Sequence, residues 1–246
     1  MASRRLGAAV ALVAAVAVAA GLAMWWRSDP GAPASMPVAS VQGVQIDRSA
    51  GADPGLADAV RRSVTLVDAS GCGQARQATA TLVDADGGPT ALTNQHVVAG
   101  AVDAEFTDGS GRPRSLDVTE RVAARDAVHL DAAPLEDAGV EPLPVGPRPI
   151  VGSRVMVAGF PGGAFQAHVG RIERVERRHG YGGTVDMLIV DVEAIPGISG
   201  GVVVDLQGRA VGLVAARDPE TGDTVAYPLD TLAGATTGAS RRCGEE

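Results

Sequence analysis

Short apolar runs rich in β-branched residues recur along most of this chain, and they constrain its fold more than any other feature. Runs such as "SVTLVDA", "RVMVAGF" and "MLIVDVEA" alternate with turn-forming pairs such as Asp108-Gly109 and Gln207-Gly208. About a dozen short strands separated by Gly, Asp and Pro predict an all-β sandwich or barrel arrangement. Helical periodicity is weak here, and only "LADAVRR" and residues 227–235 permit a short helix.

The amino-terminal end differs from the rest, because an uncharged apolar run extends from Leu6 to Trp26. A helix of this length spans roughly 30 Å, the thickness of a bilayer core, whereas the apolar part of a cleaved signal peptide is usually about 7–15 residues. Arg4 and Arg5 predict that residues 1–5 stay in the cytoplasm. We therefore expect residues 6–26 to be a transmembrane anchor, with a long signal peptide as the alternative. Both interpretations place the rest of the chain outside the cytoplasm.

The remaining sequence divides into a linker and a folded domain. Residues 27–56 are rich in Pro, Gly, Ala and Ser without a sustained period, which predicts a flexible linker. Residues 57–246 are expected to form one folded domain. Its two cysteines, Cys72 and Cys243, favour a disulfide over two free thiols if the domain is exported.

The net charge of −8 argues against one class of partner. Affinity for nucleic acid depends on clustered cations, and the sequence contains no basic cluster of that kind. We therefore expect no nucleic-acid partner, and we expect neither a metal nor a cofactor.

The stretch "AIPGISGGVVVD", residues 194–205, places Ser199 in a Gly-X-Ser-Gly-Gly setting. A serine hydroxyl is a weak nucleophile at neutral pH unless a base lies within hydrogen-bond reach and a third group orients that base. Of the four histidines, His96 in "LTNQHVVAG" has the setting of a base, because a β run ends there and Val97-Val98 would support the ring. His129, His168 and His179 lie on probable strands or a polar turn, where structural or solvated roles are expected.

The motifs "LTNQHVVAG" and "PGISGGVVVD", in this order, resemble those of the chymotrypsin-like serine proteases, particularly the HtrA (Deg) type. The similarity covers roughly residues 63–229 and includes "SRVMVAGFPGG" and "VVVDLQGRAVGLVAA". It implies two six-stranded antiparallel β-barrels, here preceded by the transmembrane helix. It also implies an endopeptidase that acts on protein or peptide substrates.

The resemblance assigns roles to individual residues. His96 is the base, and Asp126 in "AARDAVHLDAA" is the expected acid, with Asp131 as the alternative. The backbone N–H groups of Gly197 and Ser199 would form the oxyanion hole, while Gly200 and Gly201 would let the chain leave without blocking the substrate.

Other positions bear on specificity and activation. Glu193, six residues before Ser199, corresponds to the base of the S1 pocket in related proteases, with an exposed strand-end charge as the alternative. Ile198 replaces the Asp that pairs with a cleaved amino terminus in digestive enzymes, and "ATATLV" replaces a Gly-Ser-Gly-aromatic stretch. Within the family, the membrane-anchored acid-resistance proteases of actinobacteria are most similar, and their cysteine positions also imply the pairing of Cys72 with Cys243.

Two other functions remain open at this point. The unusual surroundings of Asp126 and Ile198 are compatible with a catalytically inactive homologue that acts as a binding or scaffold protein. The same three residues would also serve a serine esterase.

Overall fold

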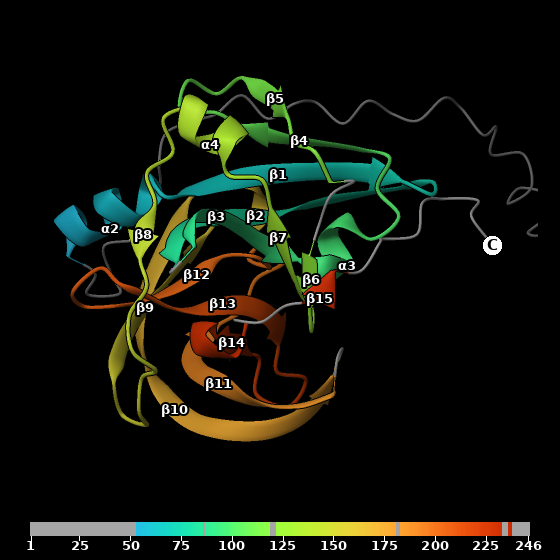
Figure 1. Ribbon diagram of the computed structural model, residues 1–246. Helices are drawn as coiled ribbons and strands as arrows, with labels where there is room; N and C mark the ends of the chain where they lie inside the picture. The colour runs from blue at the N-terminus through green and yellow to red at the C-terminus, as the bar shows by residue number, and fades with distance from the viewer. Residues whose placement is uncertain (1–52, 86, 119–121, 181–182, 233–235, 238–246) are drawn as a thin grey trace, which may run out of the picture. The chain divides into compact units, whose positions relative to one another are not determined.

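The computed structural model describes residues 53–85, 87–118, 122–180, 183–232 and 236–237, all of which belong to one compact unit of the chain (Figure 1). The predicted anchor and Cys243 lie outside the described residues. Within the described ones, no helix has the length and apolar character needed to cross a membrane.

Strands dominate the described part of the chain, as the sequence predicts. The elements in chain order are α2 (Pro54–Arg61), β1 (Val64–Gly71), β2 (Gln74–Ala85), β3 (Gly88–Asn94), α3 (Gln95–Val98), β4 (Asp103–Thr107), β5 (Pro113–Ser115), β6 (Val122–Ala124), β7 (Ala127–Leu130), α4 (Ala133–Asp137), β8 (Leu143–Pro144), β9 (Arg154–Gly159), η2 (Pro161–Gly163), β10 (Gln166–Gly180), β11 (Gly183–Glu193), β12 (Val202–Asp205), β13 (Ala210–Arg217), β14 (Asp223–Pro228), η3 (Leu229–Thr231) and β15 (Thr236–Thr237).

The second half of the chain forms a closed six-stranded barrel in the order β10-β11-β14-β13-β12-β9. All of its neighbouring strands pair antiparallel (Figure 1). This half confirms the predicted six-stranded antiparallel barrel.

The first half differs from the prediction of a second six-stranded barrel. Its described strands form a nine-stranded sheet in the order β15-β6-β7-β3-β2-β1-β4-β5, with β8 added in parallel beside β2. Two of its strands, β5 and β6, have only three residues each. The carboxy-terminal strand β15 then pairs with β6. Short strands at the margins thus enlarge this sheet beyond the six that were expected.

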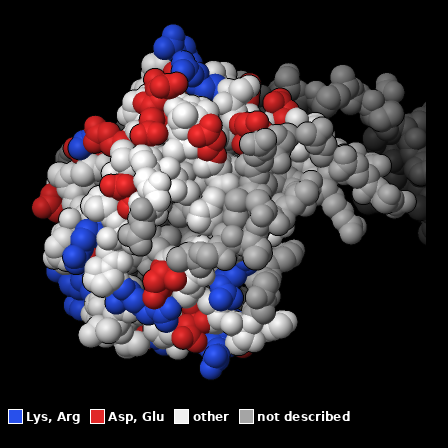
Figure 2. All heavy atoms as spheres, viewed as in Figure 1, with Lys and Arg blue, Asp and Glu red and all other residues white. Residues whose placement is uncertain are grey.

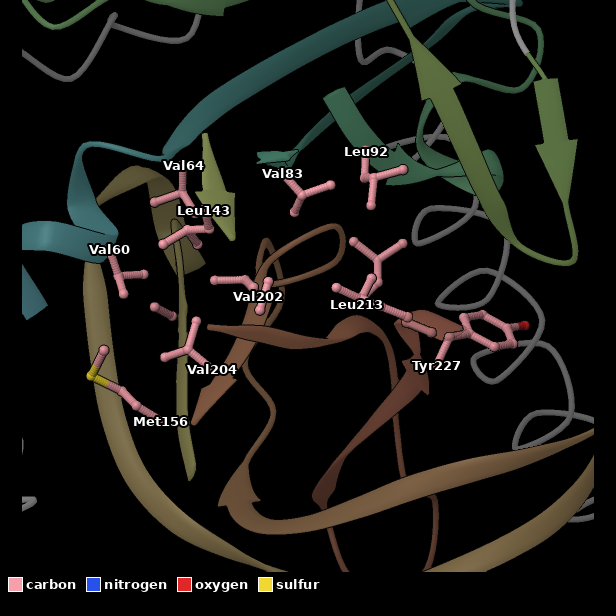
Figure 3. Packing of buried hydrophobic residues seen from close by; sticks show 14 of the residues in the cluster. Val60, Val64, Val83, Leu92, Leu143, Met156, Val202, Val204, Leu213 and Tyr227 are labelled. Atoms are coloured by element: carbon pink, nitrogen blue, oxygen red, sulfur yellow. The ribbon is translucent and has the colours of Figure 1, made fainter. Parts of the chain in front are cut away.

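A shared hydrophobic cluster joins the sheet to the barrel (Figure 3). Val64, Val83 and Leu92 come from the sheet, and they pack in one cluster with Val202 and Leu213 of the barrel. Burying an aliphatic side chain of this size contributes about 1.5–3 kcal/mol. The two halves are therefore held as one body, and the segments at their boundary are held with them.

Helix α2 covers part of this cluster. Asp53 caps it by accepting a 2.8 Å hydrogen bond from the Gly55 N–H, and Pro54 occupies the first helical position. The guanidinium of Arg61 lies 4.9 Å from the ring centre of Phe160 and 5.6 Å from that of Phe165. Such cation–π contacts hold the end of the helix against the barrel.

Charged side chains of both signs occur over the surface of the described residues (Figure 2). The carboxylate of Asp218 is buried at the turn that follows β13. It accepts hydrogen bonds from the backbone N–H groups of Glu220 and Thr221 and from Arg174 and Arg178. These bonds, led by that from Glu220, lower the pKa of Asp218 to about 2, so the turn keeps its anionic centre at neutral pH.

Candidate active site

The segment that carries Ser199 lies against the nine-stranded sheet. Ser199 lies between β11 and β12 of the barrel, and its carbonyl oxygen accepts a 2.8 Å hydrogen bond from the Thr79 N–H in β2. The hydroxyl of Thr93, at the end of β3, donates to the Thr79 carbonyl oxygen at 2.8 Å. Three residues later the chain reaches His96. Ser199 and His96, which are 103 residues apart in sequence, therefore lie at the same boundary between sheet and barrel.

The short helix α3 presents His96 at this boundary. Val97 and Val98 are buried in the core of the sheet, whereas the His96 side chain is 40% exposed. The two valines therefore anchor this helical turn, and the imidazole stays partly open to solvent.

The structure brings Asp126 to His96. The Nδ1 atom of His96 lies 2.7 Å from Oδ2 of Asp126, and the His96 backbone N–H donates to Oδ1 at 2.9 Å. The Asp126 carbonyl oxygen accepts from the Asn94 side chain at 2.9 Å and from the Gln95 N–H at 3.1 Å. Both the carboxylate and the backbone carbonyl of Asp126 thus bond to the segment that carries His96, and the Asp126 side chain is buried.

Asp126 owes its position to a two-residue hairpin turn. Ala124 of β6 pairs with Ala127 of β7, so Arg125 and Asp126 form the whole loop. Arg125 has a φ of 61°, in the left-handed region that such tight hairpins require. A non-glycine residue in this conformation costs roughly 1–2 kcal/mol. This strained conformation of Arg125 lets the hairpin turn the Asp126 carboxylate toward His96.

Asp131, the alternative acid, has a different role. Its Oδ1 accepts the Ala133 N–H at 3.0 Å at the start of α4, and its side chain is exposed. The carboxylate that contacts His96 is that of Asp126.

The backbone before Ser199 forms a tight turn. The Ile198 N–H donates to the Ile195 carbonyl oxygen at 3.1 Å, and the two residues between them are Pro196 and Gly197. Gly197 has a φ of 97°. Proline followed by glycine with positive φ is the signature of a type II turn.

This turn leaves two backbone donors without a partner. The Pro196 carbonyl oxygen accepts the Gly162 N–H at 3.1 Å. In the part of the chain that the structure describes, the N–H groups of Gly197 and Ser199 donate to no protein acceptor. A pair of free N–H groups beside a serine hydroxyl has the character of an oxyanion hole.

The glycines of the Ser199 segment are required by close packing. A Cβ on Gly197 would lie 2.9 Å from the Phe160 carbonyl oxygen, and one on Gly200 would lie 2.0 Å from the Thr79 carbonyl oxygen. A Cβ on Gly201 would lie 2.5 Å from the Ala158 carbonyl oxygen. The missing Cβ atoms of Gly200 and Gly201 make room for the backbones of β2 and β9, and the expected role of these glycines in leaving the substrate unblocked stays a prediction.

Two further features concern the segment that carries Ser199. Among the described residues, the Ser199 hydroxyl makes no hydrogen bond with the His96 ring, a contact that often tightens only when substrate binds. Ile198 is buried in the barrel core, where its Cδ1 lies against Gly159. Apolar packing thus occupies the position at which digestive enzymes place an aspartate.

Several site residues were missed from the sequence. Tyr227 of β14 is buried, and burial followed by the Asp126 charge raises its pKa, while a hydrogen bond with the Asp126 backbone opposes that shift. Asn94 and Thr79 contact the site through hydrogen bonds to backbone atoms. Asn94 belongs to the recognised motif, whereas Tyr227 lies about one hundred residues from Asp126 and carries no local signal.

Glu193 lies at the end of β11 with its side chain 75% exposed. Its Oε1 is 3.9 Å from Nη2 of Arg217 in β13, so a cation already accompanies this carboxylate. The exposure agrees with the alternative of a strand-end charge, and its role in an S1 pocket stays a prediction.

The other three histidines and Cys72 have surroundings of their own. His129 of β7 is half-buried, and burial lowers its pKa. His168 contacts Gln166, and His179 is exposed. Cys72 lies in the β1–β2 turn, but Cys243 is outside the described residues, so their pairing stays a prediction.

Comparison with known proteins shows relatives of one kind. Residues 78–213, more than half of the chain, match the model of the trypsin-like peptidase domain. The serine protease Rv3671c of Mycobacterium tuberculosis is 34% identical over 146 residues, which are 53% of this chain and 35% of that protein. The chain thus spans about a third of the length of this curated relative.

Solved structures extend the similarity to the whole fold. The active form of the Rv3671c protease superimposes with a TM-score of 0.66 at 23% identity, covering 85% of this chain and 96% of that one. A serine-to-alanine variant of the HtrA-type protease AlgW, with a tripeptide, gives a TM-score of 0.58 at 23% identity, with coverages of 72% of this chain and 60% of that one.

Proposed function

Because the chain belongs to the family of trypsin-like peptidase domains, we propose that it is a serine endopeptidase with a catalytic triad of His96, Asp126 and Ser199. The observation that carries this proposal is the double contact of Asp126 with His96, through the ring at 2.7 Å and the backbone at 2.9 Å. A carboxylate in this position fixes the tautomer of a histidine base and stabilises its protonated form.

The proposed reaction is acyl transfer. His96 Nε2 takes the proton from the Ser199 hydroxyl as the oxygen attacks a peptide carbonyl, and it returns that proton to the leaving amine. The N–H groups of Gly197 and Ser199 bind the oxyanion of the tetrahedral intermediate. Water then attacks the acyl-enzyme with His96 again as the base, which releases the second product and restores the serine.

Protein or peptide chains are the proposed substrates. The bound tripeptide of AlgW is consistent with this class of substrate. The ion pair of Glu193 with Arg217 weakens any preference for Arg or Lys that an unpaired carboxylate would confer.

A fluorophosphonate probe tests the proposed nucleophile. The wild-type chain is expected to be labelled on Ser199, as located by peptide mass spectrometry, and to cleave an unfolded protein such as casein. Ser199→Ala is the control, and labelling that persists in this variant would refute the assignment. An unlabelled wild type would favour the inactive homologue, and turnover of small esters without any proteolysis would favour the esterase.

We further propose that residues 6–26 anchor the protease domain to a membrane with the domain outside the cytoplasm. The support is the length of the apolar run and the arginines before it. A reporter enzyme fused after Glu246 is expected to be active only outside the cytoplasm. Cytoplasmic reporter activity would contradict this topology.

We also propose a disulfide between Cys72 and Cys243. The exported chain, unfolded without reductant, is then expected to show no free thiol, and two titratable thiols would contradict the disulfide.

A further inference from the structure

Thr79 of β2 makes several hydrogen bonds to the segment that carries Ser199 and to its surroundings. Its side chain is fully buried. Its hydroxyl donates to the Gly197 carbonyl oxygen at 3.0 Å and accepts the Phe160 N–H at 2.9 Å. Its backbone N–H donates to the Ser199 carbonyl oxygen at 2.8 Å. One residue of β2 thus bonds to both residues whose N–H groups form the proposed oxyanion hole.

The hydroxyl of Thr79 acts on the peptide unit between those two donors. The Gly197 carbonyl belongs to the peptide that joins Gly197 to Ile198, and the N–H of this peptide donates to Ile195. The preceding peptide is held by the Gly162 N–H, and the following one by the Gly201 N–H, which donates to the Ile198 carbonyl. Of these restraints, only the bond to the Gly197 carbonyl comes from a side chain.

Gly197 is the residue most in need of such a restraint. A glycine has no Cβ to limit its rotation, and its φ of 97° is one of several conformations open to it. Rotation about the backbone bonds of Gly197 would change the angle between the Pro196–Gly197 peptide and the peptides that follow it, so the Gly197 and Ser199 N–H groups would no longer point at the same oxygen. The neighbouring Ile198 is apolar, so it offers no charged contact that would hold the turn.

We propose that Thr79 is a positioning residue that holds the oxyanion hole of this protease open, an inference that rests on the proposed function. Without the hydroxyl, the Gly197 carbonyl and the Phe160 N–H lose a shared partner inside the protein. A buried polar group without a partner is costly, so the segment rearranges to find a new one. The donor geometry toward the oxyanion is lost in that rearrangement.

Thr81 provides a matched control on the same strand. Its side chain is also fully buried, and its hydroxyl donates at 2.9 Å to a carbonyl of the same segment, that of Gly200. That carbonyl lies beyond Ser199, outside the peptides that carry the two donors. Substitution of either threonine by valine removes one hydroxyl and keeps the shape of the side chain.

The test measures kcat and KM with p-nitrophenyl acetate and the labelling rate with a fluorophosphonate. Thr79→Val is expected to lower kcat and the labelling rate about a hundredfold with KM within about twofold, the range found when one oxyanion donor is removed. Thr79→Ser keeps the hydroxyl and should stay within about threefold of wild type. Thr81→Val should also stay within about threefold, with a similar loss of thermal stability.

Three outcomes would overturn the inference. They are an unchanged kcat in Thr79→Val, an equal fall in kcat for Thr81→Val, and a defect confined to KM. If Thr79→Val does not fold, Thr79→Ala is measured in its place, with the same fall in kcat expected. An unlabelled wild-type chain would instead refute the proposed function, so the two failures are distinguishable.

Discussion

Replacement of Asp126 by asparagine is expected to lower kcat/KM about ten-thousandfold while leaving the fold intact. The asparagine oxygen can still accept the His96 backbone N–H, which now bonds to Oδ1 at 2.9 Å. Its amide nitrogen then faces Nδ1 of His96, the atom now 2.7 Å from Oδ2. An amide N–H donor there selects the tautomer with the proton on Nε2, and that nitrogen can no longer accept a proton from Ser199.

Asp131→Asn is the matched control for this change. Asp131 lies five residues away and bonds only to the Ala133 N–H in the structure, so activity should stay within about twofold of wild type. Hydrolysis of casein or of a chromogenic peptide ester gives the comparison, with circular dichroism as the check of folding. A large loss in Asp131→Asn together with an active Asp126→Asn would exchange the roles of the two carboxylates.

Replacement of Gly200 by alanine is expected to destabilise the protein by about 2–5 kcal/mol and to lower activity at least a hundredfold. Two costs add here. A side chain at a φ of 77° costs roughly 1–2 kcal/mol, and overpacking typically costs a further 1–3 kcal/mol or more. The new Cβ would lie 2.0 Å from the Thr79 carbonyl oxygen and 2.6 Å from Oγ1 of Thr93. The strand and the segment must separate, and a displacement of about 1 Å at the adjacent Ser199 accounts for the loss of activity.

Gly139→Ala separates the two costs. Gly139 has a similar φ of 82°, but a Cβ built there meets no atom within 4 Å. This variant should lose only about 1–2 kcal/mol and keep its activity. Urea denaturation of both variants gives the free energies of unfolding. Equal losses would show that backbone conformation, and not the contact with Thr79, makes glycine necessary at position 200.

The sequence predicts the parts of the site that lie within contiguous motifs. His96 and Ser199 each have a recognisable setting, and the structure brings both to one boundary. The sequence alone does not show which of Asp126 and Asp131 contacts His96, because both aspartates lie in a similar local pattern. The two-residue hairpin at Arg125 and Asp126 brings the Asp126 carboxylate to His96, and no glycine or asparagine marks that turn in the sequence.

Contacts between distant segments were beyond sequence reasoning. In the sequence, Thr79 is only part of the stretch "ATATLV" that replaces a glycine-rich one. Gly197, whose carbonyl oxygen accepts its hydroxyl, lies 118 residues further along the chain. The sheet shows the same limitation, because strands of two or three residues such as β8 and β15 are too short to show a period. They form where an existing strand offers a free edge, which depends on the assembled fold.

The division of the site between sheet and barrel also sets the order in which its parts can come together. A ribosome delivers His96 and Asp126 first, and Ser199 is synthesised 103 residues after His96. The N–H of Gly200 is held by Val214 of β13, a strand that follows later still. A nascent chain therefore carries the proposed base and acid without a positioned Ser199 until almost all of its strands have been made. The proposed protease activity is therefore expected to arise only when the fold is complete.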